Sequence, residues 1–208
     1  MTRTVTSITI HLNSSAYRLP GLAALLSGGF EVTAKLPCPL SDLLVEQMGV
    51  PRDYLQNRIQ TLFLNGDPVD DVEGTTVHAG DVLALSAAMP GLVGATMRKQ
   101  GPLASLRRQV TLSDSPSAET ADGREEVNVK LFNMVVEELG PIFLARGIVI
   151  PPDILSNFIG AAGDTLEKIT RGLEVDNKPV ALADLPSALT FDNAVYLTIL
   201  AETDPATH

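Results

Sequence analysis

Alternating apolar and polar side chains predict two strands near the start of the chain. Residues 5–12 alternate in this way and are rich in β-branched residues, which is typical of a strand. The segment FEVTAKLP continues the pattern and predicts a second strand. The inward positions of that strand are Phe30, Val32, Ala34 and Leu36. The stretch between the strands is longer than a tight hairpin needs, so we interpret residues 14–29 as a loop whose leucines pack against the fold.

Helical spacing replaces the two-residue period in the segment PLSDLLVEQM. Its apolar positions recur every three or four residues, which predicts a helix over residues 39–48. The apolar stripe consists of Leu40, Leu43, Leu44 and Met48. Gly49 favours an end to this helix, and Pro51 prevents its continuation.

Turn residues then separate three further strands. The segment TLFL predicts a strand that ends at Asn65-Gly66, a pair that accepts the left-handed backbone of a tight turn. DPVDD predicts a short edge strand, and a turn at Gly80 leads to a strand over residues 82–87. The order strand, strand, helix, strand, short strand, strand is a β-grasp arrangement. We therefore expect an α+β protein whose N-terminal domain, residues 1–97, has the β-grasp (ubiquitin-like) fold.

The composition changes after this domain. Residues 98–123 mix basic residues with Ser, Thr, Pro and Gly, which predicts a linker or a surface strap. We expect residues 124–204 to form a mainly helical C-terminal region. Asp122 and Glu125 have the spacing of a capping box at the start of its first helix, and Pro141 predicts a kink in that helix. The apolar positions at helical spacing are Leu131, Val135, Leu139, Ile142 and Phe143.

Two more helices and one strand complete the predicted C-terminal region. The segments IPPDILSNFIG and DTLEKITRG predict helices, the second ending at Gly172, and VDNKPV predicts a turn. Residues 195–200 are β-branched and aromatic, which favours a terminal strand, with a helix as the alternative. No internal repeat is evident along the chain.

Charge argues against nucleic acid as a partner. The chain of 208 residues carries a formal net charge of −10, which a phosphate backbone would repel. No run of about 20 apolar residues could cross a bilayer, and the N-terminal segment lacks the basic and apolar parts of a signal peptide. We expect a cytoplasmic protein that binds neither nucleic acid nor a membrane.

Basic residues gather in one part of this acidic chain. Residues 98–113 contain four basic residues and no acidic one. These residues, Arg98, Lys99, Arg107 and Arg108, form a candidate patch for an acidic protein partner. Pairing with the acidic C-terminal half of the same chain, or simple solvation, is the alternative.

Residues that commonly bind metals or attack substrates are sparse. Cys38 is the only cysteine, and the three histidines, His11, His78 and His208, have no ligand spacing with one another. The chain contains no phosphate-binding loop and no Gly-x-Ser-x-Gly elbow, and the adjacent acids Asp70-Asp71 and Glu137-Glu138 fit a solvated surface. We therefore predict no metal site, no cofactor and no enzymatic activity.

Three segments of the first half resemble one family of small carriers. They are LSDLLVEQMGV, LFLNGDPV and VHAGDVLALSAAMPGLVGA. Over about residues 4–97 they are similar to the β-grasp sulfur carriers, namely the small subunit of molybdopterin synthase and the sulfur carrier of thiamine biosynthesis. The resemblance implies a protein partner, either an activating enzyme of the E1 type or the partner subunit of a synthase.

The tail of such a carrier needs a free C-terminal carboxylate, which this chain does not have at the matching position. The family's C-terminal Gly-Gly carboxylate is adenylated and converted to a thiocarboxylate. Gly91 and Gly94 fall in the matching segment PGLVGA, Gly94 matches the penultimate glycine, and Ala95 stands in place of the last. The chain continues past Ala95, so no free carboxylate exists there.

These observations favour a non-catalytic β-grasp module that recognises a protein. The first alternative is a carrier precursor that is cleaved near Gly94 or Ala95. The second alternative is a ligand-binding protein or enzyme with a pocket between the two halves of the chain.

Overall fold

The computed structural model describes residues 4–13, 19–87, 124–189 and 193–202. It is a mixed α/β protein in which parallel and antiparallel strand pairs occur together with several helices. The chain forms two compact units. Unit 1 combines Met1–Phe30 with Leu139–His208, and unit 2 is the continuous stretch Glu31–Glu138.

Unit 1 draws its strands from both ends of the chain. Its strands are β1 (Val5–Asn13), β9 (Ile148–Ile150), β10 (Thr170–Val175), β11 (Lys178–Pro179) and β12 (Ala194–Glu202). Its helices are α1 (Leu22–Gly28), α5 (Pro152–Ile169), α6 (Leu185–Ala188) and the 3₁₀ turn η4 (Leu182–Asp184), together with the C-terminal part of α4 (Met134–Arg146). The strand order is β11-β10-β1-β12-β9.

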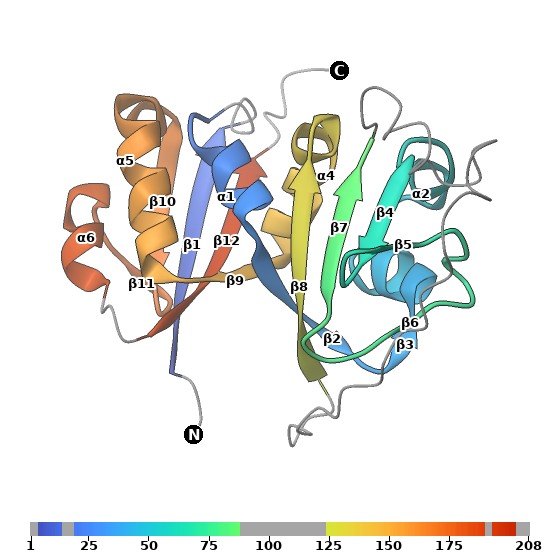
Figure 1. Ribbon diagram of the computed structural model, residues 1–208. Helices are drawn as coiled ribbons and strands as arrows, with labels where there is room; N and C mark the ends of the chain where they lie inside the picture. The colour runs from blue at the N-terminus through green and yellow to red at the C-terminus, as the bar shows by residue number, and fades with distance from the viewer. Residues whose placement is uncertain (1–3, 14–18, 88–123, 190–192, 203–208) are drawn as a thin grey trace. The chain divides into compact units, whose positions relative to one another are not determined.

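The N-terminal strand lies between two C-terminal strands of unit 1 (Figure 1). β1 pairs in parallel with β12, with Ile8 opposite Leu197. On its other side β1 pairs antiparallel with β10, with Ile10 opposite Leu173. The inward side chains of β1, which are Ile8, Ile10 and Leu12, are each 0% exposed.

This burial makes β1 essential to unit 1. Each fully buried aliphatic side chain contributes about 1.5–3 kcal/mol, so three contribute about 5–9 kcal/mol. A domain is stable by only about 5–15 kcal/mol in total. Unit 1 therefore depends on a strand that lies far from its remaining strands in the sequence.

An aromatic contact adds to the core of unit 1. The rings of Phe30, the last residue of the N-terminal segment of this unit, and Phe143 meet edge to face with their centroids 5.4 Å apart.

Unit 2 contains a five-stranded sheet and a separate two-stranded pair. Its strands are β2 (Phe30–Lys35), β3 (Cys38–Pro39), β4 (Thr61–Leu64), β5 (Asp67–Pro68), β6 (Thr76–Val77), β7 (Val82–Ser86) and β8 (Arg124–Phe132). Its helical segments are the π-helical turn η2 (Asp42–Gln47) and α2 (Arg52–Asn57), and α4 begins here. The order in the sheet is β2-β8-β7-β4-β5, and β3 pairs with β6.

A parallel pair lies at the centre of the unit 2 sheet (Figure 1). β7 pairs in parallel with β8, with Leu85 opposite Leu131, and antiparallel with β4, with Leu62 opposite Leu85. Leu43 and Leu44 of η2 are fully buried, and Met48 N–H donates to the Leu43 carbonyl over 2.9 Å, a wide helical turn.

Much of the strand and turn pattern predicted from the N-terminal half is confirmed. Strands form over Val5–Asn13, Phe30–Lys35, Thr61–Leu64 and Val82–Ser86, and the turns at Asn65-Gly66 and Gly80 have positive φ. The predicted helical stripe is buried. Two helices form where the sequence predicted none: α1 lies in the stretch that we interpreted as a loop, and α2 lies between the predicted helix and the strand at residues 61–64. The expected packing of the loop leucines is nevertheless confirmed, since Leu22, Leu25 and Leu26 are buried.

The first helix predicted for the C-terminal region is wrong in its N-terminal half. Residues Arg124–Phe132 form β8, and α4 begins only at Met134. Val127, Val129 and Leu131 alternate along this segment and are buried, so a two-residue period overrides the local capping signal. Asp122, the proposed cap, lies outside the described residues.

The prediction of a single strand in the C-terminal region is also wrong. Five strands, β8 to β12, lie beyond residue 123, and the terminal strand is confirmed as β12. Gly172 lies inside β10 and does not end a helix. The two helices predicted before it form α5, which is broken at Gly163 (φ 42°), and α4 continues through Pro141.

The grouping of the chain differs from the linear division that the composition favoured. β1 belongs with the C-terminal strands because it pairs with β10 and β12, and β8 belongs with residues 31–87 because it pairs with β7. The segment 98–123, expected to be a linker or strap, lies outside the described residues. In the part of the chain that the structure describes, no helix is long and apolar enough to cross a membrane.

Candidate functional site

The unit 2 sheet has a buried face and an open face. Along β7, Leu83 and Leu85 are buried, whereas Val82 is 36% exposed and Ala84 is half-buried. Residues opposite one another on paired strands point to the same side. The open face therefore follows from the register of β4, β5, β7 and β8. We call it the outer face and define it by Phe63, Pro68, Val82, Ala84, Asn128, Lys130 and Phe132.

The outer face combines apolar side chains with two polar ones on β8, Lys130 and Asn128, the latter opposite Val82. Phe63 lies opposite both Pro68 and Ala84, and Ala84 lies opposite Lys130. Phe132, 37% exposed, ends β8. An apolar row therefore crosses β5, β4 and β7 at Pro68, Phe63 and Ala84, and Phe132 lies beside this row on β8, opposite Ser86.

Two hydroxyl residues mark the end of this face. Ser86 lies opposite Thr61 and Phe132, and its Oγ accepts a hydrogen bond of 3.0 Å from the Asn133 amide. Thr61 is 1% exposed, and its Oγ1 has no hydrogen-bond partner among the described residues. The apolar row therefore ends at buried polar groups.

A carboxylate on α4 receives two hydrogen bonds from α2. The Tyr54 hydroxyl and the Arg58 guanidinium both donate to Glu138. The hydrogen bond from Tyr54, followed in size of effect by that from Arg58, holds the pKa of Glu138 below its usual value. Burial, together with the hydrogen bond to Glu138, raises the pKa of Tyr54. The cluster connects α2 to the N-terminal part of α4, within unit 2.

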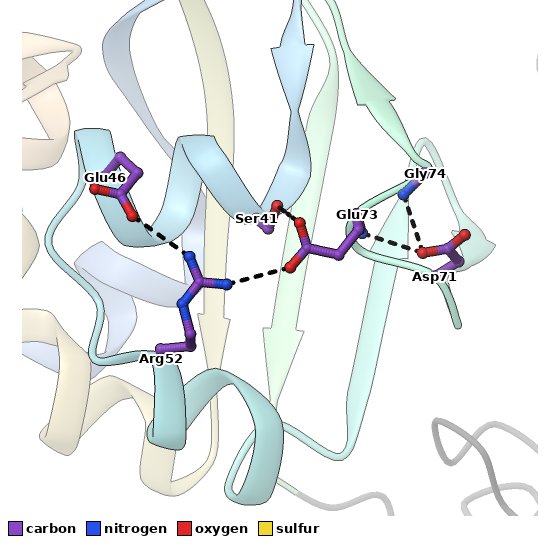
Figure 2. Close-up of polar contacts among 6 residues, drawn as sticks. All are labelled: Ser41, Glu46, Arg52, Asp71, Glu73 and Gly74. Carbon is purple, nitrogen blue, oxygen red and sulfur yellow. Dashed lines mark hydrogen bonds and ion pairs between the residues drawn. The ribbon is translucent and has the colours of Figure 1, made fainter.

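A second polar cluster fastens the loop before β6 (Figure 2). The hydroxyl of buried Ser41 donates to Oε2 of Glu73 over 2.6 Å. Arg52 contacts Oε1 of Glu73 at 3.3 Å and Oε1 of Glu46 at 3.4 Å. Oδ1 of Asp71 accepts the N–H groups of Glu73 and Gly74, which closes the loop locally. Each charge in the two ion pairs is at least half exposed, so water screens these pairs and each contributes only about 0–1 kcal/mol.

The surroundings of the single cysteine favour its neutral thiol form. Gln47 Nε2 donates to Cys38 Sγ over 3.3 Å. Burial, followed by the nearby Asp42 carboxylate, raises the pKa of the Cys38 thiol.

Among the described residues, one histidine contacts an acidic side chain. His78 lies 3.9 Å from Asp81, ring nitrogen to carboxylate oxygen, while Asp81 also accepts the backbone N–H of His78. Within the described ranges, no group of three or more His, Cys, Asp or Glu side chains could hold a metal ion.

The site residues predicted from the sequence lie outside the described residues. This holds for the tail candidates Gly91, Gly94 and Ala95 and for the basic patch of Arg98, Lys99, Arg107 and Arg108. The sequence reasoning missed the outer face, because it assigned Phe132 to a helix. The alternation of Val127, Val129 and Leu131 is the signal that could have placed Phe132 on a strand.

Comparisons of the chain with family models, with curated proteins and with solved structures returned no match.

Proposed function

We propose that this protein is a non-catalytic docking module of the β-grasp type and that unit 2 binds a protein partner through its outer face. The strand order of unit 2 supports the β-grasp interpretation. A parallel pair lies at the centre, a hairpin (β4–β5) lies at one edge, and a helical segment connects β2 to β4. β8, rather than the predicted first strand over residues 5–12, is the strand that pairs in parallel with β7.

The observation that carries the proposal is the concentration of exposed apolar side chains on unit 2. Four large apolar residues among those described are at least about one-third exposed. Val82 and Phe132 belong to the outer face, and Met134 follows Phe132 by two residues. Only Val5, on β1, belongs to unit 1. Contiguous exposed apolar surface is typical of protein interfaces.

The resemblance to sulfur carriers names the class of partner. Such carriers dock on an activating enzyme of the E1 type or on the partner subunit of a synthase. Docking through a sheet face does not require the free C-terminal carboxylate that sulfur transfer needs. A continuous chain could therefore keep the docking function without the carrier chemistry.

Binding of purified partners tests this proposal. The E1-type enzyme and the synthase partner subunit of the same host are titrated separately against the full chain by calorimetry. We expect one of them to bind, and Phe132→Asp to weaken that binding at least tenfold, because a charge then replaces an exposed apolar side chain of the outer face. Val5→Lys is the control, since Val5 is 43% exposed against 37% for Phe132 but lies in unit 1.

Circular dichroism establishes that both variants are folded. If neither purified protein binds the wild-type chain, or if Phe132→Asp and Val5→Lys bind equally well, the proposal is wrong.

A further inference from the structure

The β4–β5 and β10–β11 hairpins have the same construction. Each has two central residues with positive φ: Asn65 (54°) with Gly66 (89°), and Asp176 (49°) with Asn177 (62°). In each hairpin the second residue of the return strand is a proline, Pro68 or Pro179, opposite the residue two positions before the turn. Two-residue turns of this kind fix the register of the strands that they join.

The hydrogen bonds that leave the two hairpins also correspond. Asn65 N–H donates to the Val82 carbonyl over 2.8 Å, and Val82 N–H donates to Asn65 Oδ1 over 2.9 Å. In unit 1, Asp176 N–H donates to the Ser7 carbonyl over 2.8 Å, and Ser7 N–H donates to Asp176 Oδ1 over 2.9 Å. Ser7 therefore occupies in unit 1 the place of Val82 in unit 2.

One spacing in the sequence relates the two hairpins. It separates Asn65 from Asp176, and the same number of residues separates Leu62 from Leu173 and Val69 from Val180. The Val69 N–H donates to the Leu62 carbonyl, and the Val180 N–H donates to the Leu173 carbonyl, each over 2.9 Å. The correspondence therefore includes residue identity, backbone conformation and hydrogen bonding.

The two sheets share a strand plan as well. Read from the hairpin edge, unit 2 has the order β5-β4-β7-β8-β2, and unit 1 has the order β11-β10-β1-β12-β9. In both, the third and fourth strands form a parallel pair, with Val82 opposite Asn128 and Ser7 opposite Tyr196. In both, a helical segment leads from the fifth strand of this order to the hairpin.

From these correspondences we infer that residues 5–86 and 124–202 are two copies of one structural repeat, and that each copy donates one strand to the sheet of the other. The first copy gives β1 to unit 1, where it becomes the third strand. The second copy gives β8 to unit 2, where it becomes the fourth strand. Each half of the chain is thus a binding partner of the other half.

The side chains of the donated strands explain why the exchange holds the halves together. Ile8, Ile10 and Leu12 of β1 are fully buried in unit 1, and Val127, Val129 and Leu131 of β8 are at most 1% exposed in unit 2. Separating the halves would expose both apolar rows and break the backbone ladders of both central pairs. A cut between β7 and β8 therefore leaves one non-covalent particle and releases no free carrier domain.

Cleavage of the intact chain tests this inference directly. A specific protease site is inserted within residues 98–123, the full-length protein is cut, and the mass is measured by light scattering after native gel filtration. We expect one particle with the mass of the whole chain, 22.1 kDa plus the insert, and two bands on a denaturing gel. Elution of two separate folded fragments overturns the inference.

Hydrogen exchange on two core variants provides an independent test. Ile10→Asp is expected to lower amide protection at least tenfold in β10 and β12, which lie far away in the sequence. Val129→Asp is expected to do so in β4 and β7. Thr9→Ser and Lys130→Gln, at outward positions of the same strands, are the matched controls and keep wild-type protection.

A linear arrangement of domains gives the opposite pattern. If Ile10→Asp removes protection from residues 31–87 and spares β10 and β12, the inference is wrong. If either variant unfolds both units together, the cleavage experiment decides, since it uses the wild-type strands.

Discussion

The backbone N–H of Ser7 donates a 2.9 Å hydrogen bond to Oδ1 of Asp176, a residue 169 positions further along the chain. The Asp176 N–H returns a 2.8 Å bond to the Ser7 carbonyl. Because Asp176 also has a positive φ of 49°, this residue both forms the β10–β11 turn and fastens it to β1. Asp176 therefore has two roles: its backbone adopts the left-handed conformation of the turn, and its side chain accepts a hydrogen bond from β1.

Two substitutions of Asp176 test these two roles. Asp176→Ala removes the side-chain acceptor. Alanine also adopts the left-handed region less readily than Asp or Asn, because its side chain cannot form a local hydrogen bond. We expect unfolding free energy to fall by about 1–3 kcal/mol in urea titrations. Asp176→Asn keeps both the acceptor and the tolerance of positive φ, as Asn65 does in the other hairpin, so we expect a change below about 0.5 kcal/mol. Equal effects of the two variants would contradict this account.

The sequence predicted features that are encoded within a few residues. The strand at Phe30–Lys35 follows from alternation, and the Asn65-Gly66 turn follows from backbone preferences that neighbours do not alter. Residues 124–132 carried two conflicting signals. Their alternation prevailed because the Leu131 side chain packs in a sheet beside Leu85 of another strand, a contact that no local pattern reveals.

The candidate site was harder to predict than the fold for the same reason. Phe132 and Phe63 share a face only because both neighbour β7, and that pairing joins parts of the chain far apart in the sequence. The exchange of β1 and β8 has the same long-range origin. A motif consists of residues that are neighbours in sequence. The recognisable motifs of this chain are the glycines and the basic residues between β7 and β8, which is why the predicted site residues lie there.

Glu138 is expected to make stability depend on acidic pH. Its pKa lies below the ordinary value of 4.5, because Tyr54 and Arg58 donate hydrogen bonds to the charged form. A carboxyl group with a depressed folded-state pKa stabilises the fold above its unfolded pKa and loses that contribution as pH falls through the folded pKa. Glu138→Gln should therefore lower the urea midpoint at pH 7, and the difference from the wild type should shrink as the pH falls below the ordinary value of 4.5. Glu137→Gln, an exposed neighbour, is the control. A difference that grows as the pH falls would rule out this linkage.

Tyr54 makes the complementary prediction at alkaline pH. Burial and the hydrogen bond to Glu138 raise its pKa above the ordinary value of 10. The unfolded chain loses this proton first, so stability should fall as pH rises above about 10. Absorbance at the tyrosinate band should show that one of the three tyrosines ionises late, and Tyr54→Phe should remove this late phase. A late phase that survives in Tyr54→Phe would assign the effect to another tyrosine.

Cys38 should react slowly with thiol reagents. The thiolate is the reactive form, and burial followed by the Asp42 charge raises the pKa of this thiol. At pH 8 we expect a disulfide reagent to modify the folded protein several-fold more slowly than the protein in urea. Asp42→Asn should speed the reaction of the folded protein, because it removes a negative charge, whereas Asp53→Asn should not. Equal rates for the two variants would mean that burial alone governs Cys38.

Ser41 and Arg52 contact the same Glu73 carboxylate but should differ in their effect on stability. Ser41 is 0% exposed and donates to Glu73 over 2.6 Å. A hydrogen bond to a charged group contributes about 1.5–3 kcal/mol. Arg52 is 51% exposed at 3.3 Å from Glu73, and exposed ion pairs contribute about 0–1 kcal/mol. Urea unfolding should therefore show a larger loss for Ser41→Ala than for Arg52→Ala. Only the Arg52→Ala loss should shrink in 0.5 M salt, because salt screens exposed charges and leaves the buried hydroxyl unaffected. The reverse order of losses would mean that the charge pair, rather than the buried hydroxyl, fastens the loop before β6.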